Sequence, residues 1–293
     1  MVKRSTVDMA NLIAQNFYDF REYYVNIPGA KIDRSDQMTL IETGIPSSSW
    51  NAILSKNSQT NQELQDRFPE IESFYRFSCT CWIGPEQNRK TLEDVLQSQG
   101  FRAMGTTAAM ALQISKVKEL SYPNPEIKIV SVRSIRELEF YLSVLKKSFS
   151  MPQYAIDKLY GMFSRFHIED SPVFYHYLGF LGSKAVGCAS LFVTGESIGI
   201  YYVGTLPEYR GRGVGKMMTQ YCLKKAREMD FSYAVLRASA FGEPIYRQLG
   251  FREYGQFCQY NRIIHPVYQL RWKAGYYFKL VLDKFTGDAI WFS

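Results

Sequence analysis

The stretch Val203-Gly-Thr-Leu-Pro-Glu-Tyr-Arg-Gly-Arg-Gly-Val-Gly-Lys216 decides the fold of this chain. Before its turn, an apolar and β-branched run at residues 198–203 predicts a buried strand, which Pro207 ends. Beyond it, apolar residues recur at helical spacing and predict a helix with one buried face: Val214, Met217, Met218, Tyr221, Cys222 and Met229. The three intervening glycines leave backbone N–H groups able to converge on one anion at the helix N-terminus. The stretch therefore predicts a phosphate-binding turn between a strand and a helix.

The spacing of the glycines excludes two common phosphate-binding motifs. A P-loop requires G-x-x-x-x-G-K-[ST], but Arg210 stands at its first glycine and Met217 at its hydroxyl residue. A dinucleotide motif G-x-G-x-x-G that starts at Gly211 needs a glycine at Lys216, and a start two residues later fails in the same way. The pattern that fits is R-x-x-G-x-G from Arg210. Taken alone, it leaves open a glycine-rich turn that only caps a helix and binds nothing.

A second segment downstream is Tyr233-Ala-Val-Leu-Arg-Ala-Ser-Ala-Phe-Gly-Glu-Pro-Ile-Tyr-Arg-Gln-Leu-Gly-Phe251. It predicts a short strand, a helix of about two turns ended by Gly250, and a further strand. The R-x-x-G-x-G turn followed by a tyrosine ahead of Leu-Gly-Phe resembles the GNAT superfamily of acyl-CoA-dependent N-acetyltransferases. The resemblance covers roughly residues 127–262.

This resemblance implies a co-substrate, acetyl-CoA, and a role for each matching residue. The glycine turn would hold the pyrophosphate, and N–H groups near the strand end would stabilise the oxyanion that forms on the thioester carbonyl. Tyr246 would be the general acid for the leaving thiolate, although a tyrosine packed under the sheet is the alternative interpretation. The residues implied to bind the cofactor are Val203, Gly204, Thr205, Arg210, Gly211, Arg212, Gly213, Val214, Gly215, Lys216 and Ser239.

The general base is not evident from the sequence. Many members of the superfamily carry a glutamate on one of two central strands, but residues 198–203 and 233–236 contain no acid, and Glu196 is only a weak candidate. A water chain, or an acceptor that arrives deprotonated, is open. We expect an N-acetyltransferase that transfers an acetyl group to an amine on a small molecule or a protein; the alternative is a non-catalytic acyl-CoA-binding or sensor module.

An internal echo predicts a tandem architecture. Gly100-Phe-Arg-Ala-Met-Gly105 matches Gly250-Phe-Arg-Glu-Tyr-Gly255 at a separation of 150 residues, each after a predicted strand and helix. The first copy lacks the glycine turn, and Leu96 replaces the tyrosine. We therefore expect an α/β (α+β) protein of two GNAT-like mixed-sheet domains in tandem: a degenerate domain at residues 1–125, a catalytic domain at 126–262 and an aromatic, basic extension at 263–293.

Periodicity and turn residues predict the remaining elements. Helices are expected at residues 9–24, 91–100, 135–149 and 151–166, strands at 74–82 and 127–132, an antiparallel pair at 175–181 and 185–193, and a linker at 122–126.

Charge and cysteine content limit the classes of function. The net charge is +7, with 13 basic and 14 acidic residues before residue 126 and 22 against 14 after it, so the basic surplus accompanies the glycine turn. No nucleic-acid motif accompanies it, and nucleic-acid binding ranks lower. Five dispersed cysteines and three histidines give no metal-site spacing, and packing is favoured over a redox role for Cys79 and Cys81.

Apolar runs indicate where the protein resides. None approaches the ~20 residues that span a bilayer, and the N-terminus lacks a signal sequence, so we expect a soluble cytoplasmic protein. For the extension at 263–293 we favour a packed terminal element or an oligomer contact over a membrane-surface helix.

Overall fold

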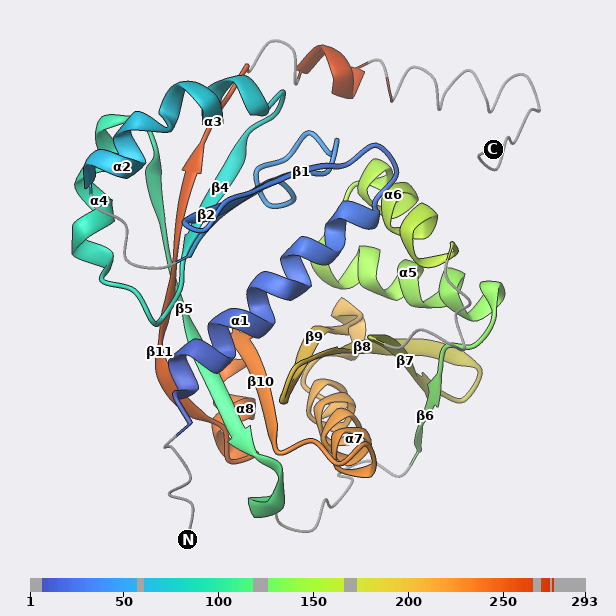
Figure 1. Ribbon diagram of the computed structural model, residues 1–293. Coiled ribbons are helices and arrows are strands. Elements are labelled where there is room, and N and C mark those ends of the chain that lie inside the picture. The colour runs from blue at the N-terminus through green and yellow to red at the C-terminus, as the bar shows by residue number, and fades with distance from the viewer. Residues whose placement is uncertain are drawn as a thin grey trace, which may run out of the picture. The chain divides into compact units, whose positions relative to one another are not determined.

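The computed structural model describes residues 7–56, 61–117, 126–165, 173–265, 270–274 and 276. The fold is mixed α/β, as predicted, and the chain forms two compact units (Figure 1). The first unit comprises Met1–Pro28, Ile83–Gln87 and Gly105–Cys258, and the second comprises Gly29–Trp82, Asn88–Met104 and Gln259–Ser293. These units do not follow the expected boundary at residue 125, because the first helix and most of a strand from the N-terminal half pack with the C-terminal half. The three-part division by sequence stays a prediction.

The sheet of the first unit carries the glycine turn. Its strands lie in the order β5 (Arg102–Gln113), β10 (Tyr233–Ala238), β9 (Ser197–Thr205), β8 (Lys184–Thr194), β7 (Phe174–Leu181) and β6 (Ile127–Ser131). Neighbours are antiparallel except β9 and β10, which run parallel. The predicted strand pair at residues 175–193 and the predicted strand at 127–132 are therefore confirmed.

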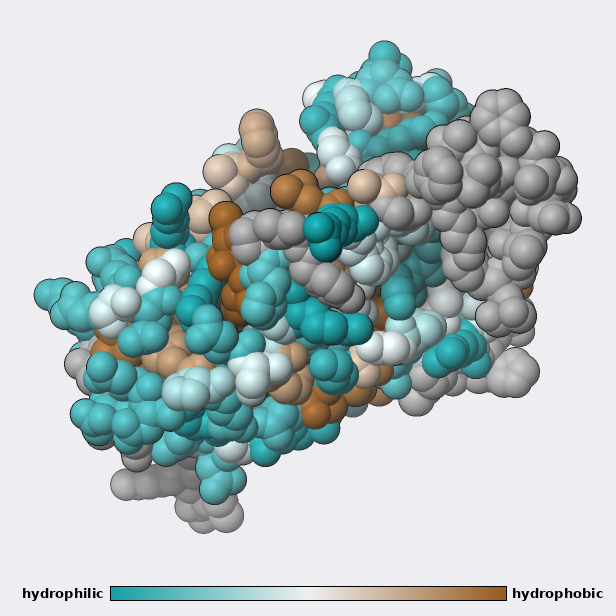
Figure 2. All heavy atoms as spheres, turned by 90° about the horizontal axis from the view of Figure 1, so that it is seen from above, coloured by the Kyte–Doolittle hydropathy of each residue, from teal (hydrophilic) through white to brown (hydrophobic). Residues whose placement is uncertain are grey.

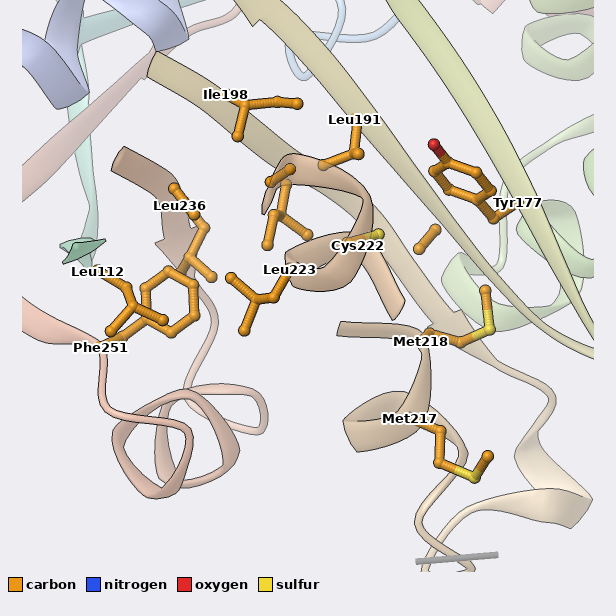
Figure 3. Packing of buried hydrophobic residues seen from close by; sticks show 14 of the residues in the cluster. Leu112, Tyr177, Leu191, Ile198, Met217, Met218, Cys222, Leu223, Leu236 and Phe251 are labelled. Carbon is orange, nitrogen blue, oxygen red and sulfur yellow. The ribbon is translucent and has the colours of Figure 1, made fainter. Parts of the chain in front are cut away.

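One face of this sheet packs against α7 (Val214–Glu228). Figure 3 shows Met218, Cys222 and Leu223 of this helix among Leu191, Ile198 and other sheet residues. Glycines in the strands let the helix approach closely, because a Cβ at Gly187 would lie 2.6 Å from Val214 Cγ1. The apolar stripe predicted from the sequence thus forms the helix's buried side.

The opposite face packs against helices from both halves of the chain. They are α1 (Met9–Glu22), followed by η1 (Tyr23–Asn26), and α5 (Ile135–Phe149), followed by α6 (Gln153–Phe163). Asp8 caps α1 by accepting from the Ala10 and Asn11 amides, and Ser134 with Glu137 forms a capping box on α5. The expected helices at residues 9–24 and 135–149 are confirmed, and α6 is shorter than expected, because Pro152 is its N-cap.

The second unit repeats the chain order of the first. Its strands are β1 (Lys31–Arg34), β2 (Met38–Glu42), β3 (Ala52–Ser55) and β4 (Cys79–Ile83), and β3 and β4 are parallel, as β9 and β10 are. Helices α2 (Asn61–Asp66) and α3 (Phe68–Phe74) come between β3 and β4, and α4 (Arg89–Ser98) precedes β5.

The sequence echo has the same backbone conformation in both copies. Gly100 and Gly250 end short helices with φ of 79° and 97°, and Gly105 and Gly255 have φ of 112° and 129°. Gly100 precedes β5 and Gly250 precedes β11 (Arg252–Arg262), whereas Gly105 and Gly255 lie within these strands. Positive φ favours glycine, so the repeated glycines have a shared structural cause.

Two expectations about the N-terminal half were wrong in detail. Residues 74–82 are not one strand: α3 runs to Phe74, with a proline in its first turn, and β4 begins only at Cys79. The helix expected at residues 91–100 begins two residues earlier, at Arg89, because the side chain of Asn88 caps α4 and accepts from the Lys90 amide.

Several expected features lie partly or wholly outside the described residues. These are most of the linker at 122–126, the end of the helix expected at 151–166 and most of the extension at 263–293. None of the described helices has the length and apolar character needed to cross a bilayer. On the face shown in Figure 2, hydrophilic residues predominate and hydrophobic ones form small separate groups.

Candidate active site

The two parallel strands of the first unit separate part-way along their length. They pair at only three positions, and the last pair joins Gly199 to Val235. Against β8, β9 contains a bulge, in which Tyr202 and Val203 stand between the pairs Tyr201–Ser190 and Gly204–Cys188. Tyr202 has a φ of 53°, which turns the strand locally. The ends of β9 and β10 therefore diverge and leave backbone groups of both strands unpaired with each other; this opening is called the splay below.

The bulge also decides which amides of β9 face the splay. The Leu206 amide donates to Val186 O at 2.9 Å, on the β8 side. Because N–H groups alternate in direction along a strand, Gly204 also faces β8, whereas Val203 and Thr205 face away from it. The structure thus separates the three residues that the sequence grouped together, and favours Val203 and Thr205 as donors into the splay.

The glycine turn follows η3 (Pro207–Tyr209) and begins α7. Gly211 and Gly213 have φ of 76° and 78°, and Gly213 is the N-cap of the helix. The Met217 amide donates to Gly213 O at 3.0 Å and makes the first bond within the helix, so the amides of residues 214–216 point out of its end. The helix dipole adds to their positive potential.

Gly215 requires a different explanation from the other two glycines. Its φ is not positive, and a Cβ there would meet only Thr205 Oγ1, at an ordinary contact distance of 3.7 Å. Neither backbone conformation nor packing therefore demands glycine at this position. Bare backbone at a helix N-terminus fits a group that approaches from outside the protein, such as a pyrophosphate.

Basic side chains surround this turn. Arg210 Nη2 donates to Ser148 O at 3.0 Å, which caps the last turn of α5 and ties the turn to that helix. Arg212 and Lys184 both lie over the Tyr209 ring, at 5.2 and 4.8 Å from its centroid. With half-buried Lys216, they make the turn strongly cationic.

Tyr246 and Ser239 lie in the segment after β10. Tyr246, in α8 (Glu243–Gln248), packs against the core under α7, and its ring lies 5.9 Å from that of Phe251. Burial, with the nearby Cys222, raises the pKa of Tyr246 to about 12, so its hydroxyl stays protonated at neutral pH. The Ser239 hydroxyl accepts from the Gly242 amide at 3.2 Å and helps to start α8. Packing and a proton-donor role are thus compatible in Tyr246.

Comparison with known proteins identifies this part of the chain. Residues 131–251 match the model of the acetyltransferase (GNAT) family. This stretch belongs to the GNAT family. No curated protein matches the sequence significantly.

Solved structures similar to most of the chain include GCN5-related N-acetyltransferases and a tandem GNAT protein. A GCN5-related N-acetyltransferase from Kribbella flavida is 13% identical, with a TM-score of 0.67 over 87% of this chain and 96% of its own. A functionally unknown conserved protein from Staphylococcus epidermidis ATCC 12228 is 17% identical, with a TM-score of 0.63 over 81% and 95%. A tandem GNAT protein from the clavulanic acid biosynthesis pathway is 11% identical, with a TM-score of 0.57 over 86% and 95%. At these identities, the likeness shows a shared fold.

The first unit also contains polar residues that the sequence analysis did not select. On the face opposite α7, Arg21, Tyr24, Tyr201, Tyr202 and Arg237 gather around the splay. The signal for three of them was present, because an arginine inside the apolar run of β10 and paired tyrosines in β9 are unusual in buried strands. Arg21 and Tyr24 come from α1 and η1, which no local pattern connects to residue 237.

Glu196, the weak candidate for the general base, lies away from the splay. It occupies the turn between β8 and β9, immediately before Ser197. From there to Thr205 the strand extends about 30 Å at about 3.3 Å per residue. Glu196 is therefore at the wrong end of β9 to accept a proton beside the glycine turn.

Proposed function

We propose that the GNAT domain transfers an acetyl group from acetyl-CoA to an amine. The observation that carries this proposal is the adjacency of the splay and the glycine turn: both begin at the end of β9, and Thr205 borders Gly215. A phosphate held at the turn and a thioester at the splay would be joined by an extended pantetheine arm. Gly215, which neither fold nor packing requires, is the residue that this placement explains.

The residues present fit the coenzyme's chemical groups. The amides of Val214, Gly215 and Lys216, with Arg212 beside them, would bind the pyrophosphate through charge-assisted hydrogen bonds. The amides of Val203 and Thr205 would face the thioester oxygen as negative charge develops on it. When bound, acetyl-CoA supplies an activated acyl group with a thiolate as leaving group.

Tyr246 would then supply a proton to the departing sulfur. Its raised pKa keeps the hydroxyl protonated at neutral pH, so that it would be available to donate to the sulfur as negative charge develops there. The acceptor amine needs no strong base if it arrives neutral. Because β9 and β10 carry no acidic residue, we propose that solvent water removes the amine proton.

A second function is favoured by one observation, the lack of an acid on β9 and β10. A domain of this kind could bind an acyl-CoA without catalysis and act as a sensor. Release of free CoA thiol from acetyl-CoA in the presence of amines distinguishes the two functions. An enzyme gives amine-dependent thiol release, whereas a sensor binds acetyl-CoA and gives none.

The variant Gly213→Glu tests whether the glycine turn binds the pyrophosphate. A carboxylate at the N-cap would repel the pyrophosphate, and a side chain would be strained at a φ of 78°. We expect acetyl-CoA binding to disappear in calorimetry, with the circular dichroism spectrum of the folded protein retained. Unchanged affinity would contradict the cradle assignment.

A further inference from the structure

The α1 helix fixes a second layer of side chains behind the splay. Asn16 Nδ2 donates to Ser197 Oγ at 3.1 Å, and the Tyr201 hydroxyl donates to Asn16 Oδ1 at 2.8 Å. Phe20 stacks on the Tyr201 ring with centroids 3.8 Å apart and planes 5° from parallel. These contacts hold the last turn of α1 against β9, on the face opposite α7.

Two guanidinium groups come together in this layer. Arg21, in the last turn of α1, is 6% exposed, and its Cζ lies 4.8 Å from the centroid of the Tyr24 ring. Arg237 lies in β10 two residues beyond Val235, the last residue paired with β9, and its Cζ is 5.7 Å from the Phe17 ring centroid. Its Nη1 donates to Thr107 Oγ1 at 3.3 Å. One arginine therefore borders the splay from the helix and the other from the strand.

Arg237 keeps its charge at neutral pH. Burial first, and then repulsion from Arg21, lowers the pKa of Arg237 to about 10, which is still well above neutrality. Two like charges close together in a buried layer carry a large desolvation and repulsion cost. A carboxylate bound by both guanidinium groups would place an opposite charge in this layer.

Phenol groups complete the layer. The hydroxyls of Tyr24 and Tyr202 are hydrogen-bonded to each other, and the Tyr202 backbone forms the bulge that opens the splay. Burial raises the pKa of Tyr24, Tyr201 and Tyr202, so all three are neutral hydrogen-bonding groups. The acid that interacts with Tyr201 is Asp19, which accepts from Gln15 at 2.7 Å and from Thr194. Guanidinium and phenol donors together suit a carboxylate, whose geometry matches the planar fork of arginine.

We propose that Arg21 and Arg237 bind the carboxylate of the acceptor, so that this domain acetylates an amine that also carries a carboxylate group. The inference rests on the proposed function, because it assigns the acceptor of the same reaction. Side chains alternate along β10, so Arg237 lies on the α1 face while its neighbour Leu236 packs toward α7. An acceptor held by its carboxylate on the α1 face would direct its amine through the splay to the thioester.

The test compares matched acceptors on the full chain. Free CoA thiol is measured with acetyl-CoA and three sets of amines: α-amino acids, their carboxamides and the corresponding decarboxylated amines. We expect kcat/KM for the best amino acid to exceed that of its carboxamide by about 10- to 150-fold, the range of a charged hydrogen bond. Equal use of amino acid and carboxamide overturns the proposal. Preference for a phosphate-bearing amine, included as a fourth set, assigns the anion site to phosphate and overturns the carboxylate assignment.

Variants separate anion binding from structural support. Arg237→Gln should lose the preference for the amino acid, mainly through KM, and leave kcat/KM for the carboxamide within a few-fold. Arg136→Gln, which removes an exposed charge on α5, should keep the preference. Calorimetry with acetyl-CoA shows whether Arg237→Gln is folded, because the contacts proposed for that ligand are at the glycine turn and the β9 amides and do not include Arg237. Equal losses for all acceptors in Arg237→Gln would make Arg237 a structural residue and overturn the proposal.

A second measurement tests the anion site if the proposed acetyl transfer is not observed. If no amine releases CoA, N-acetylated amino acids and N-acetylated amines are titrated into the CoA-bound protein. Binding of the carboxylate compounds alone, lost in Arg237→Gln, supports the anion site without catalysis. Absence of that binding overturns the site.

Discussion

The substitution Gly215→Ala should raise stability and weaken acetyl-CoA binding at the same time. A Cβ at this position meets only Thr205 Oγ1 at 3.7 Å, so the apo protein accommodates it without strain. Alanine exceeds glycine in helix propensity by up to about 1 kcal/mol in a helix interior, so we expect a smaller gain in the first turn of α7. The same methyl group would lie where the backbone approaches the pyrophosphate. Overpacking by one methyl costs about 1 to 3 kcal/mol, which corresponds to roughly 5- to 150-fold weaker binding.

Two measurements on this variant check that stability rises while acetyl-CoA binding weakens. Chemical denaturation gives the free energy of unfolding, and calorimetry gives the dissociation constant of acetyl-CoA. The matched control is Gly161→Ala in α6, a helical glycine whose added Cβ would meet Pro28 Cγ at 3.2 Å; it should leave the dissociation constant unchanged. If Gly215→Ala binds acetyl-CoA as tightly as the original protein, bare backbone at residue 215 has no role in binding. The proposal that the glycine turn binds the pyrophosphate through bare backbone would then be refuted.

Three further predictions concern catalysis, stoichiometry and pH. Tyr246→Phe should lower turnover by about 10²- to 10⁴-fold while acetyl-CoA affinity stays within a few-fold. Unchanged turnover would show that Tyr246 only packs in the core, and lost binding would make it a structural contact. Titration should give one acetyl-CoA per chain, because the N-terminal half has no glycine turn and buried Leu96 replaces the tyrosine; two equivalent sites would contradict this. Burial lowers the pKa of His176 to about 3, so the unfolded chain binds a proton below about pH 6.5 that the folded protein does not. The free energy of unfolding should therefore fall by about 2 kcal/mol from this residue between pH 7 and pH 5, and His176→Phe should remove that part of the slope; an unchanged slope would exclude His176 as its source.

The features that could be predicted from the sequence are those that depend on contiguous residues. The glycine turn has positive φ at two positions, and the proposed pyrophosphate contact needs bare backbone at a third, so that glycines stand at fixed spacing. Helix α7 is recognisable because its buried face repeats at helical spacing. The repeated Gly-Phe-Arg unit was detectable because the same positive φ recurs at both ends of both copies. Each of these signals is local.

The features that could not be predicted depend on contacts between distant segments. Arg21 and Arg237 are 216 positions apart in the sequence, and their approach depends on α1 packing against β9. Residues 105–117 were expected with the N-terminal domain, yet β5 pairs with β10 along six residues from Ala108 to Gln113. Arg237, Tyr201 and Tyr202 of the proposed acceptor side come from the half of the chain with the glycine turn, whereas Arg21 and Tyr24 are supplied by the other half. A boundary drawn from sequence composition alone separates them from the site.

The bulge at Tyr202 links the two sides of the site. A non-glycine residue at a φ of 53° costs about 1 to 3 kcal/mol, so a glycine would relieve the strain if only the bend were needed. Tyrosine at this position adds a phenol that hydrogen-bonds Tyr24 beneath α1. The same residue thus forms the bulge beside the splay and anchors the layer that contains Arg21. We therefore expect a strained non-glycine residue at the one position that would set both the opening of the sheet and the place of the acceptor.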